Sequence, residues 1–313
     1  MSEAALEIRP ARRDDLPAAA RIKAAGDADM GRRVHPFLAG DEPDIATMTA
    51  RTLGLLTTLH EENPEQVWVA CTHGNIAGMA AAVVRGRHGH VVAYFVDPAQ
   101  QQRGLGGPLF SALLHACQRQ GCEVLTLQNS DDPRAMTHYF RHGFRPTLPQ
   151  LVWATEALTP VGESISQLTA EPITDEATLQ TAGDIDKAVR GVRRLDELRR
   201  WTSEDGAAGL LLLDRLSGTP RGYAFLRDDQ GAIRIGPLAA NDVEDVGPIL
   251  GLALRQAATR SATSWRIAFP AENSAVVPVL LAWGFRPIWS VEAMATGVVG
   301  QFDRYVFPDL NLL

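Results

Sequence analysis

Cysteine is scarce in this sequence and follows no pattern. The three cysteines, Cys71, Cys117 and Cys122, include no C-x-x-C pair and fall where a strand, a helix and the start of a strand are predicted. A disulfide framework uses an even set of cysteines, and zinc or thiol redox motifs use closely spaced pairs. We therefore expect reduced thiols packed in the core, with no disulfide.

Long apolar runs and an excess of positive charge are also missing. The chain lacks the ~18 consecutive apolar residues of a transmembrane helix, and residues 1–15 lack the apolar core of a signal peptide. The net charge of -7 argues against nucleic acid as the main partner. We expect a cytoplasmic protein that binds neither membranes nor nucleic acid, and its acidity suits an amine substrate slightly better.

A metal site is not expected either. His138 and His142 stand four residues apart, so one helix face could present two imidazoles, but no HExxH glutamate or third ligand accompanies them. The alternative is a pair of exposed histidines at a helix end. With 313 residues, 45% of them hydrophobic, the chain has room for about two globular domains.

One stretch carries most of the chemical information. Residues 91–96 are β-branched or aromatic and are followed by Asp97-Pro98, which predicts a strand and its end. A glycine-rich turn, residues 101–107, then precedes an amphipathic helix whose apolar residues are spaced by three and four: Leu109, Phe110, Leu113, Leu114 and Cys117. Glycines at a helix N-terminus leave room and free N–H groups for an anion such as a diphosphate.

Three interpretations of this turn compete. It can be a plain tight connection between strand and helix. A dinucleotide fingerprint would need glycine where Leu109 stands, and a phosphate loop would need a lysine that is absent. The turn does match Q/R-x-x-G-x-G/A, and here the chain resembles the GNAT superfamily of acyl-CoA-dependent N-acyltransferases. The resemblance implies that the diphosphate of acetyl-CoA is held by Gln101, Gln102, Arg103, Gly104, Leu105, Gly106 and Gly107.

The segment after the helix strengthens the resemblance. Residues 124–127 predict a second strand, and Asp132 and Pro133 predict the N-cap and first position of a second helix. The family pattern N-x-x-A-x-x-x-Y-x-x-x-G-F is matched by Ala135, Tyr139, Gly143 and Phe144. Asp132 occupies the asparagine position. It keeps a capping side chain but adds a negative charge, so the contact of the family's asparagine is not carried over.

The resemblance also implies roles near the reacting thioester. A tyrosine at the position of Tyr139 stands near the sulfur and protonates the departing thiolate, whereas an aromatic residue on an apolar helix face is otherwise a core residue. Backbone groups at Phe95 and Val96 would align the pantetheine and polarise the carbonyl. A general base for the amine is left open among Asp97, His88, His90 and a water chain.

The remainder of the first half predicts a mixed domain. Strands are expected near residues 8–10, 67–71, 77–84 and 151–154, and helices near residues 18–25 and 45–59. The resemblance implies that residues 26–40 help to cover the acceptor site. We expect a first domain at residues 1–158, followed by a linker near residues 160–163.

The second half repeats the first at a fixed offset of 141 residues. Gly143-Phe144-Arg145-Pro146 falls on Gly284-Phe285-Arg286-Pro287, Gly106 falls on Gly247 and Asp132 on Asn273. The chemistry does not recur, because Gln101, Arg103 and Gly104 become Asp242, Glu244 and Asp245, and Tyr139 becomes Leu280. We expect the domain at residues 165–313 to be degenerate and to bind no coenzyme A. Its role would be structural, or it would line the acceptor pocket.

The expected fold class is α/β, with two tandem GNAT-like domains that each hold a largely antiparallel mixed sheet flanked by helices. The resemblance implies an N-acetyltransferase that moves an acetyl group from acetyl-CoA to a primary amine by direct attack. The acceptor would be a small molecule or a peptide, and no metal would be needed. The alternative function is a non-catalytic acyl-CoA sensor that signals to a partner through its second domain.

Overall fold

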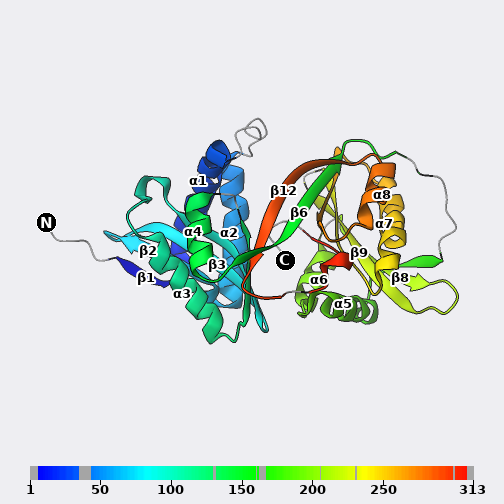
Figure 1. Ribbon diagram of the computed structural model, residues 1–313, viewed down its shortest axis with the longest axis horizontal. Helices are drawn as coiled ribbons and strands as arrows, with labels where there is room; N and C mark the ends of the chain where they lie inside the picture. Colours follow the sequence, from blue (N-terminus) through cyan, green and yellow to red (C-terminus); the bar gives the residue numbers. More distant parts are fainter. Residues whose placement is uncertain are drawn as a thin grey trace. The chain divides into compact units, whose positions relative to one another are not determined.

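The computed structural model describes residues 6–34, 44–129, 132–159, 161, 167–204, 206–229, 231–298 and 300–308. The chain forms two compact units (Figure 1). The first unit contains Met1–Arg145 and Met294–Gly297, and the second contains Pro146–Ala293 and Val298–Leu313. The expected linker near residues 160–163 falls almost entirely outside the described residues.

The first unit is built on a mixed sheet. Its strands lie in chain order, as β1 (Glu7–Pro10), β2 (Val67–Thr72), β3 (Asn75–Arg85), β4 (His88–Val96) and β5 (Val124–Asn129). The first three pairings are antiparallel, and β4 pairs with β5 in parallel. At the outer edge of β5, the Thr296 N–H donates to the Leu125 carbonyl at 2.9 Å. Residues 294–297 therefore complete this sheet from far along the chain.

Helices cover both faces of this sheet. The helical elements of the first unit are η1 (Arg13–Asp15), α1 (Leu16–Val34), α2 (Ile45–Glu62), η3 (Pro64–Gln66), η4 (Pro98–Gln100), α3 (Gly106–Arg119) and α4 (Pro133–Arg141). Small buried residues of α1, Ala19 and Ala20, share a core with Leu56 of α2. The apolar stripe of α3 and Tyr139 of α4 form the second core. The glycine turn leads from the end of β4 into α3, on the face of this second core.

The second unit contains a larger sheet. Its strand order is β12 (Arg286–Ala295), β6 (Arg145–Thr155), β11 (Ser264–Pro270), β10 (Ala232–Ala240), β9 (Pro220–Asp229), β8 (Ala208–Asp214) and β7 (Leu168–Pro172). A short strand, β13 (Tyr305–Val306), pairs with β10 off this path. The helical elements are α5 (Glu176–Arg190), α6 (Leu195–Ser203), α7 (Val243–Ala258), α8 (Val276–Ala282) and η5 (Phe302–Arg304).

Strand β6 does not stay with the first unit. Residues 151–154 were expected to end the first domain, and they do form a strand. However, β6 pairs antiparallel with β11 from Pro270↔Gln150 to Trp265↔Thr155. Trp153 packs into one core of the second unit and Val152 against the other. The two compact units divide at Arg145, so residues 146–155 of β6 belong to the second unit, where β6 pairs with β11.

The internal repeat is visible in the elements. The helix α4 ends at Arg141 and α8 ends at Ala282, and the difference between 282 and 141 is again 141. The strands β5 and β11 and the strands β6 and β12 correspond in the same way. These features confirm the predicted fold class.

Two sequence expectations can be compared directly with the structure. The three cysteines are free and buried. Of the described helices, none combines the length and the apolar character that crossing a membrane would require.

Candidate functional site

Strands β4 and β5 separate before either of them ends. They pair in parallel only from His88↔Val124 to Val91↔Leu127, although β4 continues to Val96 and β5 to Asn129. The last part of β4 is therefore paired with β3 on one side, and β5 does not pair with it on the other side. We call this opening between β4 and β5 the first splay.

A β-bulge in β4 lies at the point of separation. Opposite β3, Ala93 pairs with Ala81 and Val91 with Ala82, so Val92 is an extra residue. Val92 and Ala93 consequently face the same core, on the side of α1 and α2. The bulge resets the alternation, so that Tyr94 packs with α3 on the opposite face.

Backbone direction in β4 distinguishes Tyr94 and Val96 from Phe95. The Asp97 N–H donates to the Ala77 carbonyl of β3 at 2.9 Å. Hydrogen-bonded and non-bonded pairs alternate along an antiparallel ladder, so the backbone of Phe95 is also directed to β3. The N–H and C=O groups of Tyr94 and Val96 then point into the splay. Of the two expected strand residues, Val96 presents its backbone there and Phe95 does not, and Tyr94 was missed.

The glycine turn adopts a backbone that needs glycine at one point. The Asp97 carboxylate caps the turn by accepting from the Ala99 N–H at 2.9 Å. Gln102 and Gly104 both have positive φ, 64° and 77°, and α3 then begins at Gly106. A Cβ at Gly106 would lie 2.5 Å from the Tyr94 hydroxyl. The absence of a side chain at Gly106 therefore makes room for the Tyr94 side chain at the start of α3.

The predicted turn residues are brought together at this helix start. Gln102, Arg103 and Gly104 are exposed, Gln101, Gly106 and Gly107 are half-buried, and Leu105 is buried. The Gln101 side-chain amide donates to the Val96 carbonyl at 3.3 Å, which connects the turn to the splay. Free N–H groups at the start of α3 and the positive end of its dipole favour an anion beside these residues.

Tyr139 lies in the aromatic core beneath the splay. It is 7% exposed, and its ring centroid lies 5.5 Å from Phe110 and 6.3 Å from Tyr94. Burial raises its pKa well above the usual value, and Tyr94 and Asp132 add to the effect. Its hydroxyl makes no hydrogen bond with another described residue. The group is thus a protonated donor at neutral pH.

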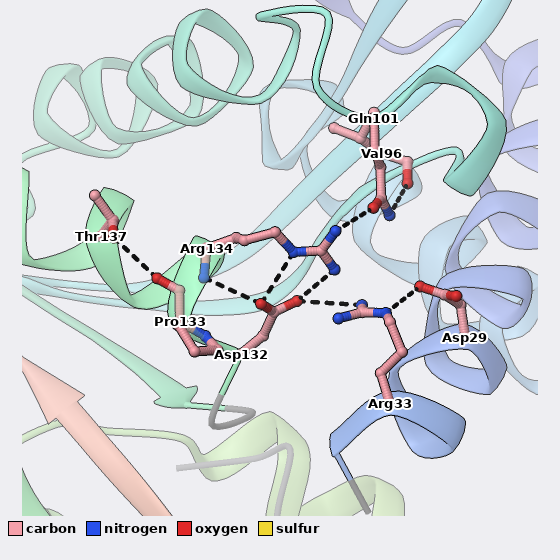
Figure 2. A network of polar contacts seen from close by, with 8 residues as sticks. All are labelled: Asp29, Arg33, Val96, Gln101, Asp132, Pro133, Arg134 and Thr137. Atoms are coloured by element: carbon pink, nitrogen blue, oxygen red, sulfur yellow. Dashed lines mark hydrogen bonds and ion pairs between the residues drawn. The ribbon is translucent and has the colours of Figure 1, made fainter.

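A charged network joins α1, the turn and α4 (Figure 2). Asp132 caps α4 by accepting from the Arg134 N–H at 3.0 Å, and Pro133 follows at the first turn, so both predictions are confirmed. The Arg134 side chain binds both Asp132 oxygens and donates to the Gln101 side chain at 2.9 Å. Arg33 of α1 donates to Asp132 at 3.2 Å and to Asp29 at 2.8 Å.

The pKa of Asp132 reflects this network. Burial alone would raise it, but the hydrogen bonds from the Arg134 side chain and N–H, together with Arg33, hold the pKa below its ordinary value. The carboxylate is therefore ionised at neutral pH. Its charge, which distinguishes it from the family's asparagine, is balanced by two arginines.

The histidines do not converge on a common point. His142 bonds Ser111 at 3.0 Å and the His138 carbonyl at 2.8 Å, and both histidines are half-buried instead of exposed. Burial, followed by Arg141 and His142, lowers the pKa of His138. His90 is buried and bonds Thr126 at 2.9 Å, in the paired part of β4. The described residues contain no group of three metal-ligating side chains.

The corresponding turn of the second unit carries its own anions. Asp242 stands just before α7, and Glu244 and Asp245 lie in its first turn. Arg221 forms ion pairs with Asp245 at 2.9 Å and with Asp242 at 3.6 Å. Carboxylates already occupy the positive end of this helix, so a diphosphate would meet like charges there.

Family models match parts of both halves of the chain. Residues 34–144 match the model of the Acetyltransferase (GNAT) family, and residues 183–304 match the model of an Acetyltransferase (GNAT) domain. A sequence comparison with curated proteins found no match.

Solved structures with the same fold span nearly the whole chain. A protein from Pyrococcus horikoshii is 17% identical with a TM-score of 0.69, covering 98% of this chain and 96% of that one. A GCN5-related N-acetyltransferase from Sphaerobacter thermophilus is 17% identical with a TM-score of 0.64, covering 98% of both chains. A tandem GNAT protein from the clavulanic acid biosynthesis pathway is 15% identical with a TM-score of 0.56, covering 94% and 99%. At these identities the likeness shows the fold alone.

The network predicts a pH-dependent contribution of Asp132 to stability. Asp132→Asn keeps a capping oxygen but removes the charge shared by two arginines, so we expect a loss of roughly 1 kcal/mol in unfolding free energy at pH 7. Because the folded-state pKa is lowered, this contribution is present above the unfolded value of about 3.9 and disappears as the pH falls through the folded value. Urea unfolding at several pH values measures it.

Asp132→Ala is the matched control. It removes the cap as well as the charge, so it should cost about 1 kcal/mol more than Asp132→Asn. If the Asn variant and the parent had equal unfolding free energies at pH 7, the interaction of the carboxylate with the two arginines would contribute nothing to stability.

Proposed function

Because the chain has a tandem GNAT architecture, we propose that its first unit transfers an acetyl group from acetyl-CoA to a primary amine. The architecture supports acyl transfer in general. The finer proposal is supported by one observation: the first splay, the start of α3 and the Tyr139 ring, whose centroid lies 6.3 Å from that of Tyr94, belong to a single unit. We assign catalysis to this unit and a structural role to the second.

Acetyl-CoA would be held mainly by backbone groups. The pantetheine arm carries amides, which would pair with the Val96 and Tyr94 groups that point into the splay. The Tyr94 N–H would donate to the thioester oxygen and stabilise negative charge as the carbonyl is attacked. The diphosphate would lie at Gln101 to Gly107, where α3 begins.

The reaction is a direct attack on the thioester. The amine nitrogen forms a bond with the carbonyl carbon, and the carbon–sulfur bond breaks as the tetrahedral intermediate collapses. The amine must lose a proton, and Asp97 or a water chain would accept it. His88 and His90 are excluded from this role because both lie in the part of β4 that pairs with β5, and His90 is also buried against Thr126.

The raised pKa of Tyr139 determines how its hydroxyl would act on the departing thiolate. A free thiol has a pKa of about 8.5, well below that of a buried phenol, so complete proton transfer from Tyr139 to the thiolate would be uphill. We assign to Tyr139 a hydrogen bond to the sulfur as its negative charge develops. The proton that finally reaches coenzyme A would come from the attacking amine.

A coenzyme A release assay tests the function. Acetyl-CoA is offered with small amines, amino acids, aminoglycosides and peptide N-termini, and free thiol is measured with time. Release that depends on one class of amine supports the proposal and identifies the acceptor. Tight binding of acetyl-CoA without release in any reaction would favour the alternative of a non-catalytic sensor, which has no need of a group placed at the sulfur.

Tyr139→Phe should lower turnover by about 10- to 1000-fold while acetyl-CoA affinity stays nearly unchanged. The reason is that the variant keeps the ring packing and loses only the hydroxyl. Single-turnover kinetics and calorimetric titration measure the two quantities. Unchanged turnover, where chemistry limits the rate, would make Tyr139 a packing residue.

Gly104→Asp should abolish measurable acetyl-CoA binding, because it places a carboxylate at the proposed diphosphate site. Gly104→Ala is the matched control. Both variants share the strain of a positive φ of 77°, and a Cβ here meets no other atom within 4 Å. We expect the Ala variant to bind within about tenfold of the parent, since αL strain costs roughly 1–2 kcal/mol. Equal affinities of the two variants would place the diphosphate elsewhere.

A further inference from the structure

The second unit contains a splay of the same kind. Strands β10 and β11 pair in parallel only from Ala232↔Ser264 to Ile235↔Ile267, although they continue to Ala240 and Pro270. A register shift against β9 follows Ile235, as the bulge against β3 follows Val91 in β4. We call this opening between β10 and β11 the second splay.

The second splay is filled by the chain itself. Strand β13 pairs antiparallel with β10, through Leu238↔Val306 and Ala239↔Tyr305. On the other side, the Phe307 N–H donates to the Ala268 carbonyl of β11 at 2.8 Å. Residues 305–307 thus make backbone hydrogen bonds with both diverging strands.

The side chains of this segment are completely enclosed. Tyr305, Val306 and Phe307 are at most 1% exposed. Val306 packs into the core that contains α7, and Tyr305 and Phe307 pack into the core that contains α5. This alternation is that of a central strand, so the segment fills the splay on both faces.

Asn273 also holds the segment. It lies 141 residues after Asp132, in the asparagine position of the motif, and it is completely buried. Its side-chain amide donates to the Tyr305 carbonyl at 2.8 Å. The motif residue of the second copy is therefore directed at a peptide backbone.

Gly236 makes room for the same segment. A Cβ at this position would lie 2.2 Å from the Phe307 carbonyl oxygen, and its φ is +136°. Any side chain would collide with the backbone of the inserted segment. The glycine is thus matched to a strand that approaches β10 closely.

A buried charged cluster receives the Tyr305 hydroxyl. Arg194 and Arg190 both donate to this oxygen, Arg190 at 3.4 Å. Arg194 is fixed by two hydrogen bonds to Asp186 at 2.7 and 2.8 Å, and Tyr223 donates to Asp186 at 2.5 Å. Two cations around one hydroxyl make the site selective for an acceptor at this position.

We propose that the second splay is a binding site for an extended peptide and that residues 305–307 are its resident ligand. The segment makes the strand-edge hydrogen bonds that a pantetheine arm would make in the first splay. The second unit would therefore exclude acyl-CoA because residues 305–307 already fill the splay, and not only because carboxylates stand at the start of α7. The comparison with acyl-CoA rests on the proposed function, whereas the peptide site does not.

Replacing the carboxylates at the start of α7 tests whether the second unit excludes acetyl-CoA because its splay is filled or because the helix start is negatively charged. In the full chain, Asp242→Gln, Glu244→Arg and Asp245→Gly together copy Gln101, Arg103 and Gly104 onto the second turn and remove all three of its carboxylates. Calorimetric titration with acetyl-CoA should give a stoichiometry near one for both the parent and the variant. A second equivalent bound by the variant would overturn exclusion by occupation. A parent that binds none would instead contradict the proposed function, and the peptide experiment then decides this inference.

The peptide experiment uses a chain that ends at Gln301 and a fluorescent peptide of residues 302–308. We expect one peptide to bind per chain, and a peptide with Tyr305→Ala and Phe307→Ala to bind at least 10-fold more weakly. A folded shortened chain that leaves the peptide unbound would overturn the proposal. If the shortened chain does not fold, amide hydrogen exchange of the full chain decides. Protection at residues 305–307 equal to that of β10 supports a resident ligand, and exchange as fast as in a free peptide refutes it.

Discussion

The end of parallel pairing between two neighbouring strands is the constraint on which the site depends. A buried strand must satisfy its backbone groups, and where β4 leaves β5 those of Tyr94 and Val96 face away from β3. The bulge at Val92 sets which residues these are and directs Tyr94 toward α3. The first splay thus results from the register of backbone pairing. The amides of an extended ligand can form the hydrogen bonds that the backbone groups of Tyr94 and Val96 require.

A second feature near this opening is a carboxylate, Asp132, whose charge is balanced by two arginines. Asp132 stands where the family has asparagine, yet its charge is shared by Arg33 from α1 and Arg134 from α4. Arg134 also bonds Gln101, so the turn proposed to hold a diphosphate is tied to the helix that carries Tyr139. The network links three elements that are distant in sequence, and it keeps a carboxylate near the turn without leaving its charge unpaired.

The two copies satisfy the same backbone requirement in different ways. In the first unit, β5 does not pair with β4 beyond Val91, and the first turn of α3 contains no acidic residue. In the second unit, β13 fills the splay and Asp242, Glu244 and Asp245 stand at the start of the helix. In the second unit, a strand and carboxylates of the chain itself therefore stand at the splay and at the helix start. These are the two places at which the first unit is proposed to bind a ligand.

Local signals in the sequence determined much of this protein. Residues that are close together in the chain predict the strand, glycine turn and helix of residues 91–117 and the cap at Asp132. The repeat at an offset of 141 residues can also be read from the sequence alone. The structure contains all of these features. Long-range pairing decided the rest. The partner of β6, the edge that Tyr94 presents and the insertion of residues 305–307 between β10 and β11 depend on register between distant segments. An apolar strand pattern shows that a segment is buried, but it does not show against which strand, so only the tertiary structure could assign these contacts.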